Sequence, residues 1–389
     1  MKKARSILVT ILVIFSFTAC SANASPSESG KSPFPGKIAI VTDATNQSAE
    51  ETYAAMQMID KYGADKILHY TWPDNFMEGQ AQMNDTMAEI AANRDVKAVL
   101  INQAVFGTNR AVDRLRGIRK DIFVVYCQPT DNVQDVAARA DLVLLQNHMD
   151  AGPAIAAQAK AQGAKVLVHY SFPRHMSMHL LAYRRDRMRE TFEESGLKFV
   201  DAMAPDPTSN VGLAGAQHFI LEDVPKKIAE YGTDTAFYST NCGMQAPLIR
   251  AVVDNRGIYP QPCCPTPFHG FPEALGIEIS DGYEGYKDLS YVISETKRTT
   301  AERGLTGRLS TWPVPVASLF TQAATEYIVK WLNSEVPDVD IDKAQLLKAC
   351  EDYVQTATGI AGSVDLRQYH ENGITYNNVY TLLLGYLVY

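Results

Sequence analysis

The chain has 389 residues, which is long enough for two domains, because a single hydrophobic core seldom grows beyond about 250–300 residues. Its composition is that of a globular protein, with 46% hydrophobic and 21% charged residues. The formal net charge of −8 supplies no basic field for a polyanion, which argues against nucleic acid as a partner.

The first twenty residues have the pattern of an export signal. Basic residues at the start precede an apolar core over Ile7–Phe17 that is too short to span a membrane, and small residues lead to Cys20. This arrangement resembles a bacterial lipoprotein signal over 1–20, in which the thiol of Cys20 carries the lipid. The alternative is an ordinary secretory signal with an incidental cysteine. Residues 21–36, rich in Ser and Pro, are expected to form a disordered tether, which places the folded part outside the cytoplasmic membrane.

A first series of apolar runs follows, and each run is separated from the next by a helical pattern. The predicted strands are Lys37–Thr42, Ile67–Thr71, Ala98–Gln103, Ile122–Gln128 and Leu142–Gln146. Strands that are apolar throughout are buried on both faces. Their alternation with helices therefore predicts a parallel sheet wound by right-handed crossovers.

A second series begins after Gln146–Ser171, which reads as a turn, an Ala-rich helix, a second turn and a buried strand. Further strands are predicted at Lys198–Ala202 and Thr235–Thr240. A long amphipathic helix is expected over Val316–Leu332, and another helix over Lys343–Gln355. The sequence thus predicts two α/β layer systems in succession.

The polar start of this stretch, with Asp150-Ala-Gly, an Ala-rich helix and then Gly163-Ala-Lys-Val-Leu-Val, resembles the first lobe crossing of ribose-type, or type I, periplasmic substrate-binding proteins. The resemblance implies an α/β fold with two Rossmann-like lobes, each containing a parallel sheet, joined by a multi-segment hinge. It implies lobe 1 over 37–147 and 280–334, and lobe 2 over 148–279 and 335–389. Further hinges are then expected near Phe268–Ser280 and Asn333–Pro337, while the C-terminal tail is an extension that the resemblance does not cover.

Ligands of open parallel sheets bind at the carboxyl ends of the strands, and two facing lobes bring those ends to one cleft. The side chains expected there are rich in amides, hydroxyls and aromatic rings, which suit a polar solute. Each of them could instead cap a loop or face solvent. The candidate ligand-binding residues are Asp43, Asn46, Trp72, Gln103, Gln128, Tyr170, Ser171, Arg174, Asn241, His269 and Trp312.

The family resemblance supports Asn46, Gln128, Asn241 and Trp312 as ligand contacts. The chain departs from the family where a hinge aspartate is usual, because His269 stands there. The loss of that carboxylate argues against a plain hexose or pentose. It makes a larger, flatter or anionic ligand, such as those of the nucleoside-binding lipoproteins of this fold class, a natural comparison.

No metal site and no cofactor are predicted. Besides Cys20 there are five cysteines, with no CxxC or Cys/His spacing typical of zinc, and they could be free thiols or form one or two disulfides. The pair His175 and His179 has helical spacing but no nearby acidic or thiol partner. The five are Cys127, Cys242, Cys263, Cys264 and Cys350.

These patterns predict a lipid-anchored extracytoplasmic protein that captures a small polar solute, such as a sugar or nucleoside, for the permease subunits of an ABC importer. The membrane contact is through the lipid anchor only. One alternative is a ligand-sensing lipoprotein that signals to a membrane receptor. Another is a hydrolase using Asp43 or His269, although GxSxG, Walker, HExxH and GxGxxG motifs are absent and no catalytic residue is assigned.

Overall fold

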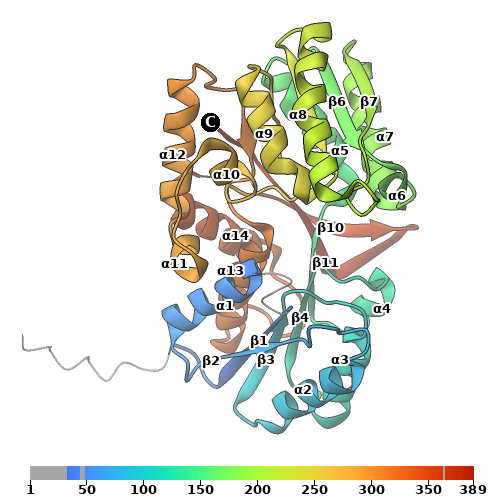
Figure 1. Ribbon diagram of the computed structural model, residues 1–389. Coiled ribbons are helices and arrows are strands. Elements are labelled where there is room, and N and C mark those ends of the chain that lie inside the picture. The colour runs from blue at the N-terminus through green and yellow to red at the C-terminus, as the bar shows by residue number, and fades with distance from the viewer. Residues whose placement is uncertain (1–32, 44–48, 362–363) are drawn as a thin grey trace, which may run out of the picture. The chain divides into compact units, whose positions relative to one another are not determined.

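The computed structural model describes residues 33–43, 49–361 and 364–389 (Figure 1). Contacts divide the chain into Met1–Pro33 and a compact unit, Phe34–Tyr389. The predicted signal over 1–20, most of the tether and the site residues Cys20 and Asn46 lie outside the described residues. None of the described helices is long and apolar enough to cross a membrane.

The compact unit contains a seven-stranded sheet with the order β10-β11-β5-β4-β3-β1-β2. Its strands β1 to β5 and β11 run parallel, and only β10 is antiparallel to its neighbour. The five strands predicted for the first series are confirmed within a few residues. The strands are β1 Lys37–Thr42, β2 Ile67–Thr71, β3 Val96–Ile101, β4 Phe123–Cys127, β5 Leu142–Gln146, β10 Val364–Glu371 and β11 Ile374–Leu384.

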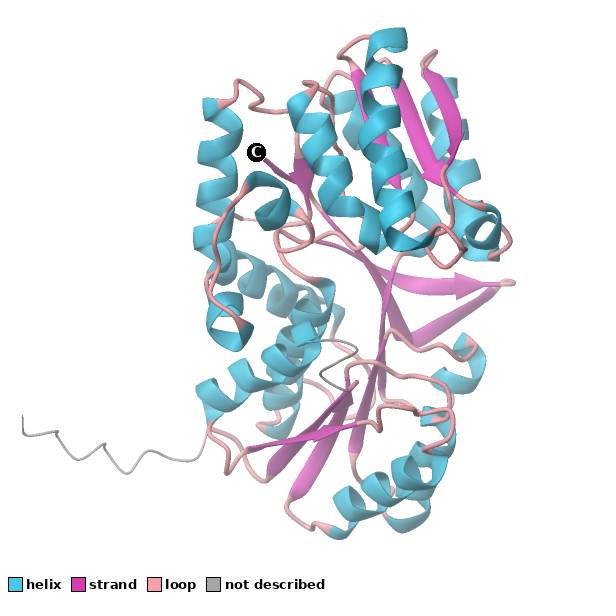
Figure 2. Cartoon of the chain, viewed as in Figure 1, coloured by secondary structure: helices cyan, strands magenta, loops and turns pink. Residues whose placement is uncertain are grey.

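Helices cover both faces of this sheet, as Figure 2 shows. Successive residues of β1 point to opposite faces, so Ile38 and Ile40 pack in one apolar cluster while Ala39 and Val41 pack in the other. Helices α1, α13 and α14 lie against the first cluster, and α2 and α3 against the second. The helices of this lobe are α1 Ala49–Tyr62, α2 Gln80–Ala92, α3 Thr108–Ile118, α4 Val133–Ala137, α13 Val316–Leu332 and α14 Lys343–Thr358.

A second lobe is built on a three-stranded parallel sheet with the order β7-β6-β8. Its strands are β6 Val166–Ser171, β7 Lys198–Met203 and β8 Thr235–Ser239. Its helical elements are α5 His148–Ala161, α6 Pro173–Met176, α7 His179–Glu194, α8 Gly212–Tyr231, η1 Cys242–Met244, α9 Gln245–Asp254 and α10 Phe271–Leu275. The Ala-rich helix α5 lies close to α7, because a Cβ on Gly152 would stand 2.3 Å from the carbonyl oxygen of Arg184.

Three connections within the described residues join the two lobes. The first leads from β5 into α5, and the second leads from β9 (Ser310–Thr311) into α13. The third leads from β11 to β12 (Leu387–Val388), which pairs with β9. Strand β9 belongs beside the second sheet, because Leu309 bridges to Tyr259 and the neighbouring Ile258 bridges to Ala236 of β8.

The expected division of the C-terminal half differs from this structure. Residues 335–389 are expected in lobe 2, but α14 packs on α13 and β11 pairs with β5 in the first lobe, whereas β12 does lie beside the second sheet. The expected hinge at Asn333–Pro337 accordingly joins two helices of one lobe. Helices α11 (Gly282–Lys287) and α12 (Leu289–Glu302) precede β9, and α11 contacts α1 through a hydrogen bond from the Tyr283 hydroxyl to Asp60.

The tail strands have a local sequence signal that the prediction did not use. Strands β10 and β11 are joined by Asn372 and Gly373, both with positive φ, 50° and 79°. An Asn-Gly pair in this conformation is the preferred two-residue turn of a β-hairpin. The two strands of this hairpin, β10 and β11, are part of the first sheet.

We expect Leu382→Ala to destabilise the protein by about 2–5 kcal/mol, because Leu382 is fully buried in β11 and its removal leaves a cavity. Ile374, at the other end of the same strand, is 49% exposed, and Ile374→Ala should change stability by less than about 0.5 kcal/mol. Urea unfolding of both variants measures the difference. Equal, small effects would mean that β11 does not contribute to the core.

Candidate functional site

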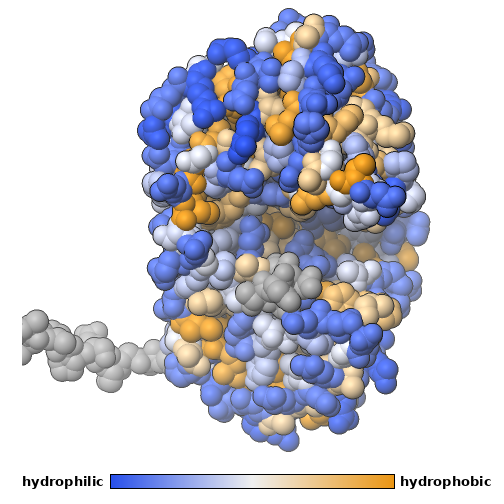
Figure 3. Space-filling view, viewed as in Figure 1, coloured by the Kyte–Doolittle hydropathy of each residue, from blue (hydrophilic) through white to orange (hydrophobic). Residues whose placement is uncertain are grey.

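A pocket of about 310 Å³ lies between the two lobes. Figure 3 shows a recess that crosses the middle of the molecule, between the two lobes. Both lobes contribute to its walls, so its shape depends on how they are oriented. The lining residues are Glu50, Gln128, Gln146, His148, Leu181, Arg184, Thr240, Cys242, Cys263, Cys264, Pro265, Thr266, Pro315 and Val316.

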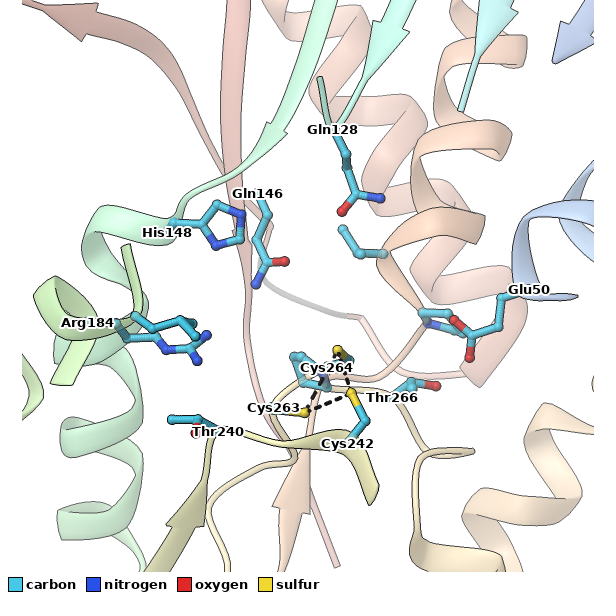
Figure 4. Close-up of a pocket in the computed structure, with 14 residues that line it drawn as sticks. Glu50, Gln128, Gln146, His148, Arg184, Thr240, Cys242, Cys263, Cys264 and Thr266 are labelled. Atoms are coloured by element: carbon cyan, nitrogen blue, oxygen red, sulfur yellow. Dashed lines mark hydrogen bonds between the residues drawn. The ribbon is translucent and has the colours of Figure 1, made fainter. Parts of the chain in front are cut away.

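Two amide side chains form much of the polar wall on the first lobe. Gln128 directly follows β4 and has a left-handed backbone with φ 49°, held by a hydrogen bond of 2.9 Å from its N–H to the carbonyl of Leu144. Gln146 ends the neighbouring strand β5. Figure 4 shows both side chains pointing into the pocket. Their placement follows from the rule that parallel strands deliver ligand-binding groups at their carboxyl ends.

The opposite wall belongs to the second lobe. The guanidinium of Arg184 is largely buried and lies over the ring of Tyr238, 5.4 Å from the centroid. Thr240 follows β8, and its hydroxyl lies 2.9 Å from the hydroxyl of Ser171 and 2.9 Å from Nδ1 of His175. This wall therefore presents the guanidinium of Arg184 and the hydroxyl of Thr240, which is held in place by hydrogen bonds to Ser171 and His175.

Three thiols meet at the floor of the pocket. The Sγ atom of Cys242, in the first residue of η1, lies 3.2 Å from that of Cys263 and 3.6 Å from that of Cys264. The Sγ atoms of Cys263 and Cys264 are 3.9 Å apart. His269 completes a group whose ligand atoms all lie within 4.8 Å of one another. Hydrogen bonds with Cys263, Cys264 and then His269 lower the pKa of the Cys242 thiol.

Only some of the sequence-predicted residues come together at this pocket. Gln128 lines it, and the side chain of Gln103 lies 3.4 Å from that of Gln128. His269 lies beside the thiols and adjoins the same space. The rule that ligand-binding residues follow the carboxyl ends of parallel strands, the strand-end rule, thus located part of the site.

The aromatic side chains that were predicted to contact the ligand are instead buried in the apolar cores. The Trp72 ring is buried and its Nε1 donates to the carbonyl of Gln103, 3.1 Å away. Tyr170 is buried and donates to a carboxylate oxygen of Asp223 over 2.9 Å, and Trp312 is 2% exposed within the main apolar cluster. None of the three is among the residues that line the interlobe pocket.

The remaining predicted polar residues have local partners. Asp43 is buried, and its N–H donates to Glu51. Arg174 makes a two-bond ion pair with Asp206 at 2.8 and 2.9 Å. The Ser171 hydroxyl is hydrogen-bonded to that of Thr240.

Asn241 caps the turn at η1, where its side-chain oxygen accepts from the N–H of Gly243 at 2.9 Å. This bond fixes the turn that presents Cys242 to the pocket. Asn241 is thus placed to orient a pocket residue and does not itself line the pocket.

Several pocket residues were missed, and some had a usable signal. Gln146 ends a predicted strand, and Thr240 ends another, so the strand-end rule covers both. Arg184 could not be found in this way, because it projects from the middle of α7. Glu50 lies in the first turn of α1, beside the undescribed residues 44–48.

The spacing of the cysteines also did not predict that three of them meet beside His269. The thiol cluster has no local spacing motif, because Cys242 is 21 residues from Cys263 and the fold brings them together. His175 and His179, the helical pair, make other contacts: the His175 ring packs at a tilt against that of Phe172, and the His179 ring stacks on that of Tyr183. No disulfide is formed by the five described cysteines.

Residues 36–310 match the family model described as "Protein of unknown function (DUF3798)". The chain belongs to this family. It is 31% identical over 218 residues to an uncharacterized protein of Treponema pallidum (strain Nichols), covering 56% of this chain and 99% of that protein. A second uncharacterized protein of the same organism is 31% identical over 176 residues, covering 44% of this chain and 80% of the relative.

Solved structures show the fold of this DUF3798 protein. A crystal structure of a proposed transcriptional regulator from Clostridium difficile 630 superimposes with a TM-score of 0.80 at 19% identity, covering 92% of this chain and 99% of that one. A sugar ABC transporter protein from Actinomyces odontolyticus ATCC 17982 gives a TM-score of 0.51 at 10% identity, covering 77% and 84%. The protein therefore has the α/β fold of type I periplasmic binding proteins, as the sequence predicted.

The pocket contains a carboxyl group whose charge depends on pH near neutrality. Burial raises the pKa of Glu50 from 4.5 to about 7, partly opposed by His269. The folded state then holds this proton more tightly than the unfolded state, so the group's contribution to stability falls as the pH rises from 4.5 to about 7. A shift of that size corresponds to at most about 3 kcal/mol, reduced by partial exposure.

We therefore expect Glu50→Gln to be more stable than the unmodified protein at about pH 8, with the gain fading toward about pH 5. Glu194→Gln, at an exposed position at the end of α7, is the matched control and should leave the pH profile unchanged. Denaturant unfolding across this range measures both. Parallel profiles for Glu50→Gln and the unmodified protein would contradict the assignment.

Proposed function

We propose that this DUF3798 protein is an extracytoplasmic solute-binding protein that captures a small polar molecule in the interlobe pocket. A lipid on Cys20 would hold it at the membrane, and an ABC importer would receive the solute. The fold supports this role, since it is shared with a sugar ABC transporter protein. The export-type N-terminal sequence supports the location.

The observation that carries the proposal is the composition of the pocket walls. Gln128 and Gln146 come from the first lobe, while Arg184 and Thr240 come from the second. A molecule that contacts both sets is bound more tightly when the lobes approach each other. Hinge closure around a ligand is the established behaviour of two lobes joined by strand-like connections.

The lining also narrows the class of solute. Amide and hydroxyl groups both donate and accept, which suits a molecule with several hydroxyl or carbonyl groups, and Arg184 suits an oxygen-rich or anionic end. A volume of about 310 Å³ is at the small end for ligand pockets, which favours a single-ring molecule. The burial of Trp72 and Trp312 removes the support for an aromatic-stacked ring. A monosaccharide-sized polyol or a similar polar solute fits best.

We expect Gln146→Ala combined with Gln128→Ala to abolish retention of a co-purified solute, because both first-lobe amides are lost. Gln134→Ala, exposed on α4, is the matched control and should retain the solute. Native followed by denatured mass spectrometry measures the retained mass. A solute bound equally by the double variant would place binding elsewhere. If no solute is retained and a panel of sugars, nucleosides and amino acids leaves the melting temperature unchanged, the sensor alternative gains support.

The membrane anchor has a separate test. We expect Cys20→Ser to move the protein from the membrane fraction to the soluble fraction, because the thiol that carries the lipid is absent. Cell fractionation with immunoblotting gives the result, and Ser21→Ala, at the next residue, is the control. Unchanged membrane association in Cys20→Ser would reject the lipid anchor while leaving the solute-binding proposal intact.

A further inference from the structure

The thiol cluster at the pocket floor has the dimensions of a metal site. In a tetrahedral zinc site with Zn–S bonds of about 2.3 Å, the sulfurs are separated by roughly 3.8 Å. The three Sγ separations here are 3.2, 3.6 and 3.9 Å. All exceed the S–S bond of about 2.05 Å, so the cluster is closer to a ligand set than to a disulfide.

The fourth group is oriented as a ligand. Nδ1 of His269 lies 2.9 Å from the carbonyl oxygen of Cys264, and a carbonyl oxygen only accepts, so Nδ1 carries the proton. In the neutral imidazole, Nε2 is then the nitrogen without a proton, and its lone pair can bind a cation. Metal-bound histidines commonly donate their second ring N–H to a backbone carbonyl in this way.

The backbone supporting these groups is constrained. Cys263 and Cys264 lie between Pro262 and Pro265, and proline fixes its own φ angle. Cys242 is held by the side-chain cap of Asn241. The Cys242 and Cys264 side chains are exposed to the pocket, so a cation can reach them from solvent.

We propose that Cys242, Cys263, Cys264 and His269 bind one thiophilic divalent cation of the Zn²⁺ class in a tetrahedral Cys₃His site. Thiolate and imidazole ligands in four-coordinate geometry select such cations over Mg²⁺ or Ca²⁺. Four protein ligands fill the coordination sphere, which is the arrangement of a structural or storage site. A cation here would tie the turn after β8 to the Pro/Cys segment and fix the floor of the pocket.

The proposal is independent of solute capture. All four ligands belong to the second lobe, to the turn after β8 and to the segment between α9 and α10. The site is therefore complete in one lobe and does not need closure. Loss of cation binding and loss of solute binding are measured by different signals and can occur separately.

The test uses the full chain, reduced and stripped of metal with a chelator, and Co²⁺ as a spectroscopic probe. We expect one equivalent of Co²⁺ to give thiolate-to-metal charge-transfer absorption and the visible bands of tetrahedral cobalt, and Zn²⁺ to displace them. Cys242→Ser should abolish the charge-transfer signal, and His269→Gln should lower the Zn²⁺ affinity at least about tenfold. Cys350→Ala, a buried thiol in the first lobe, is the control and should keep the full signal.

Three results would overturn the proposal. One is the absence of Co²⁺ absorption while thiol titration finds the three thiols free. Another is an equal signal from Cys242→Ser, with circular dichroism showing that it is folded. The last is a disulfide among Cys242, Cys263 and Cys264 in the protein as isolated, without bound metal in its native mass spectrum. Cys264→Ser provides a second ligand variant if Cys242→Ser does not fold.

Discussion

Strand β11 is the element on which the two-lobed structure depends. It runs parallel to β5 in the first sheet, and the chain then continues to β12, which pairs with β9 beside the second sheet. Tyr389 ends this path in the second lobe, where its N–H donates to Leu309 and its ring lies 5.1 Å from that of Phe271. One stretch of chain is thus hydrogen-bonded into both lobes, which couples the stability of each sheet to the position of the other.

The same connections surround the pocket. Gln146 stands at the passage from β5 to α5, and Pro315 and Val316 stand at the passage from β9 to α13. A rotation of one lobe against the other changes the backbone at these passages, and therefore moves groups that line the pocket. A ligand bound there favours whichever orientation gives it more contacts, since a ligand shifts an equilibrium only by its differential affinity for the two states.

The pattern of apolar residues predicted the fold well, because a buried parallel strand can be recognised from a short run of neighbouring apolar residues. Each apolar run of the first series became a strand, because such runs can be buried only between two helical layers. The prediction placed α14, β10 and β11 in the wrong lobe for the opposite reason. In β11 the first half is polar and exposed while the second half is buried, so no single pattern marks the strand, and its partner β5 lies more than two hundred residues earlier. The Asn372–Gly373 turn was the usable signal.

The site was less predictable, because the strand-end rule tells which residues follow a strand but not where their side chains point. It located Gln128, and it covers Gln146 and Thr240, but it also selected Trp72 and Tyr170, whose rings turn into the cores where burial of a large apolar surface is favourable.

The thiol cluster shows a second limit of sequence-based prediction, since spacing rules detect ligands that share a turn and not ligands that meet only after folding. The pocket consequently combines two kinds of group. Amides from the first lobe line the pocket, while the three thiols and His269 are gathered in the second lobe alone. A solute that touched both walls would gain from closure, whereas a cation held by four ligands of one lobe would gain nothing from it. The two proposed binding events would therefore respond differently to the same motion.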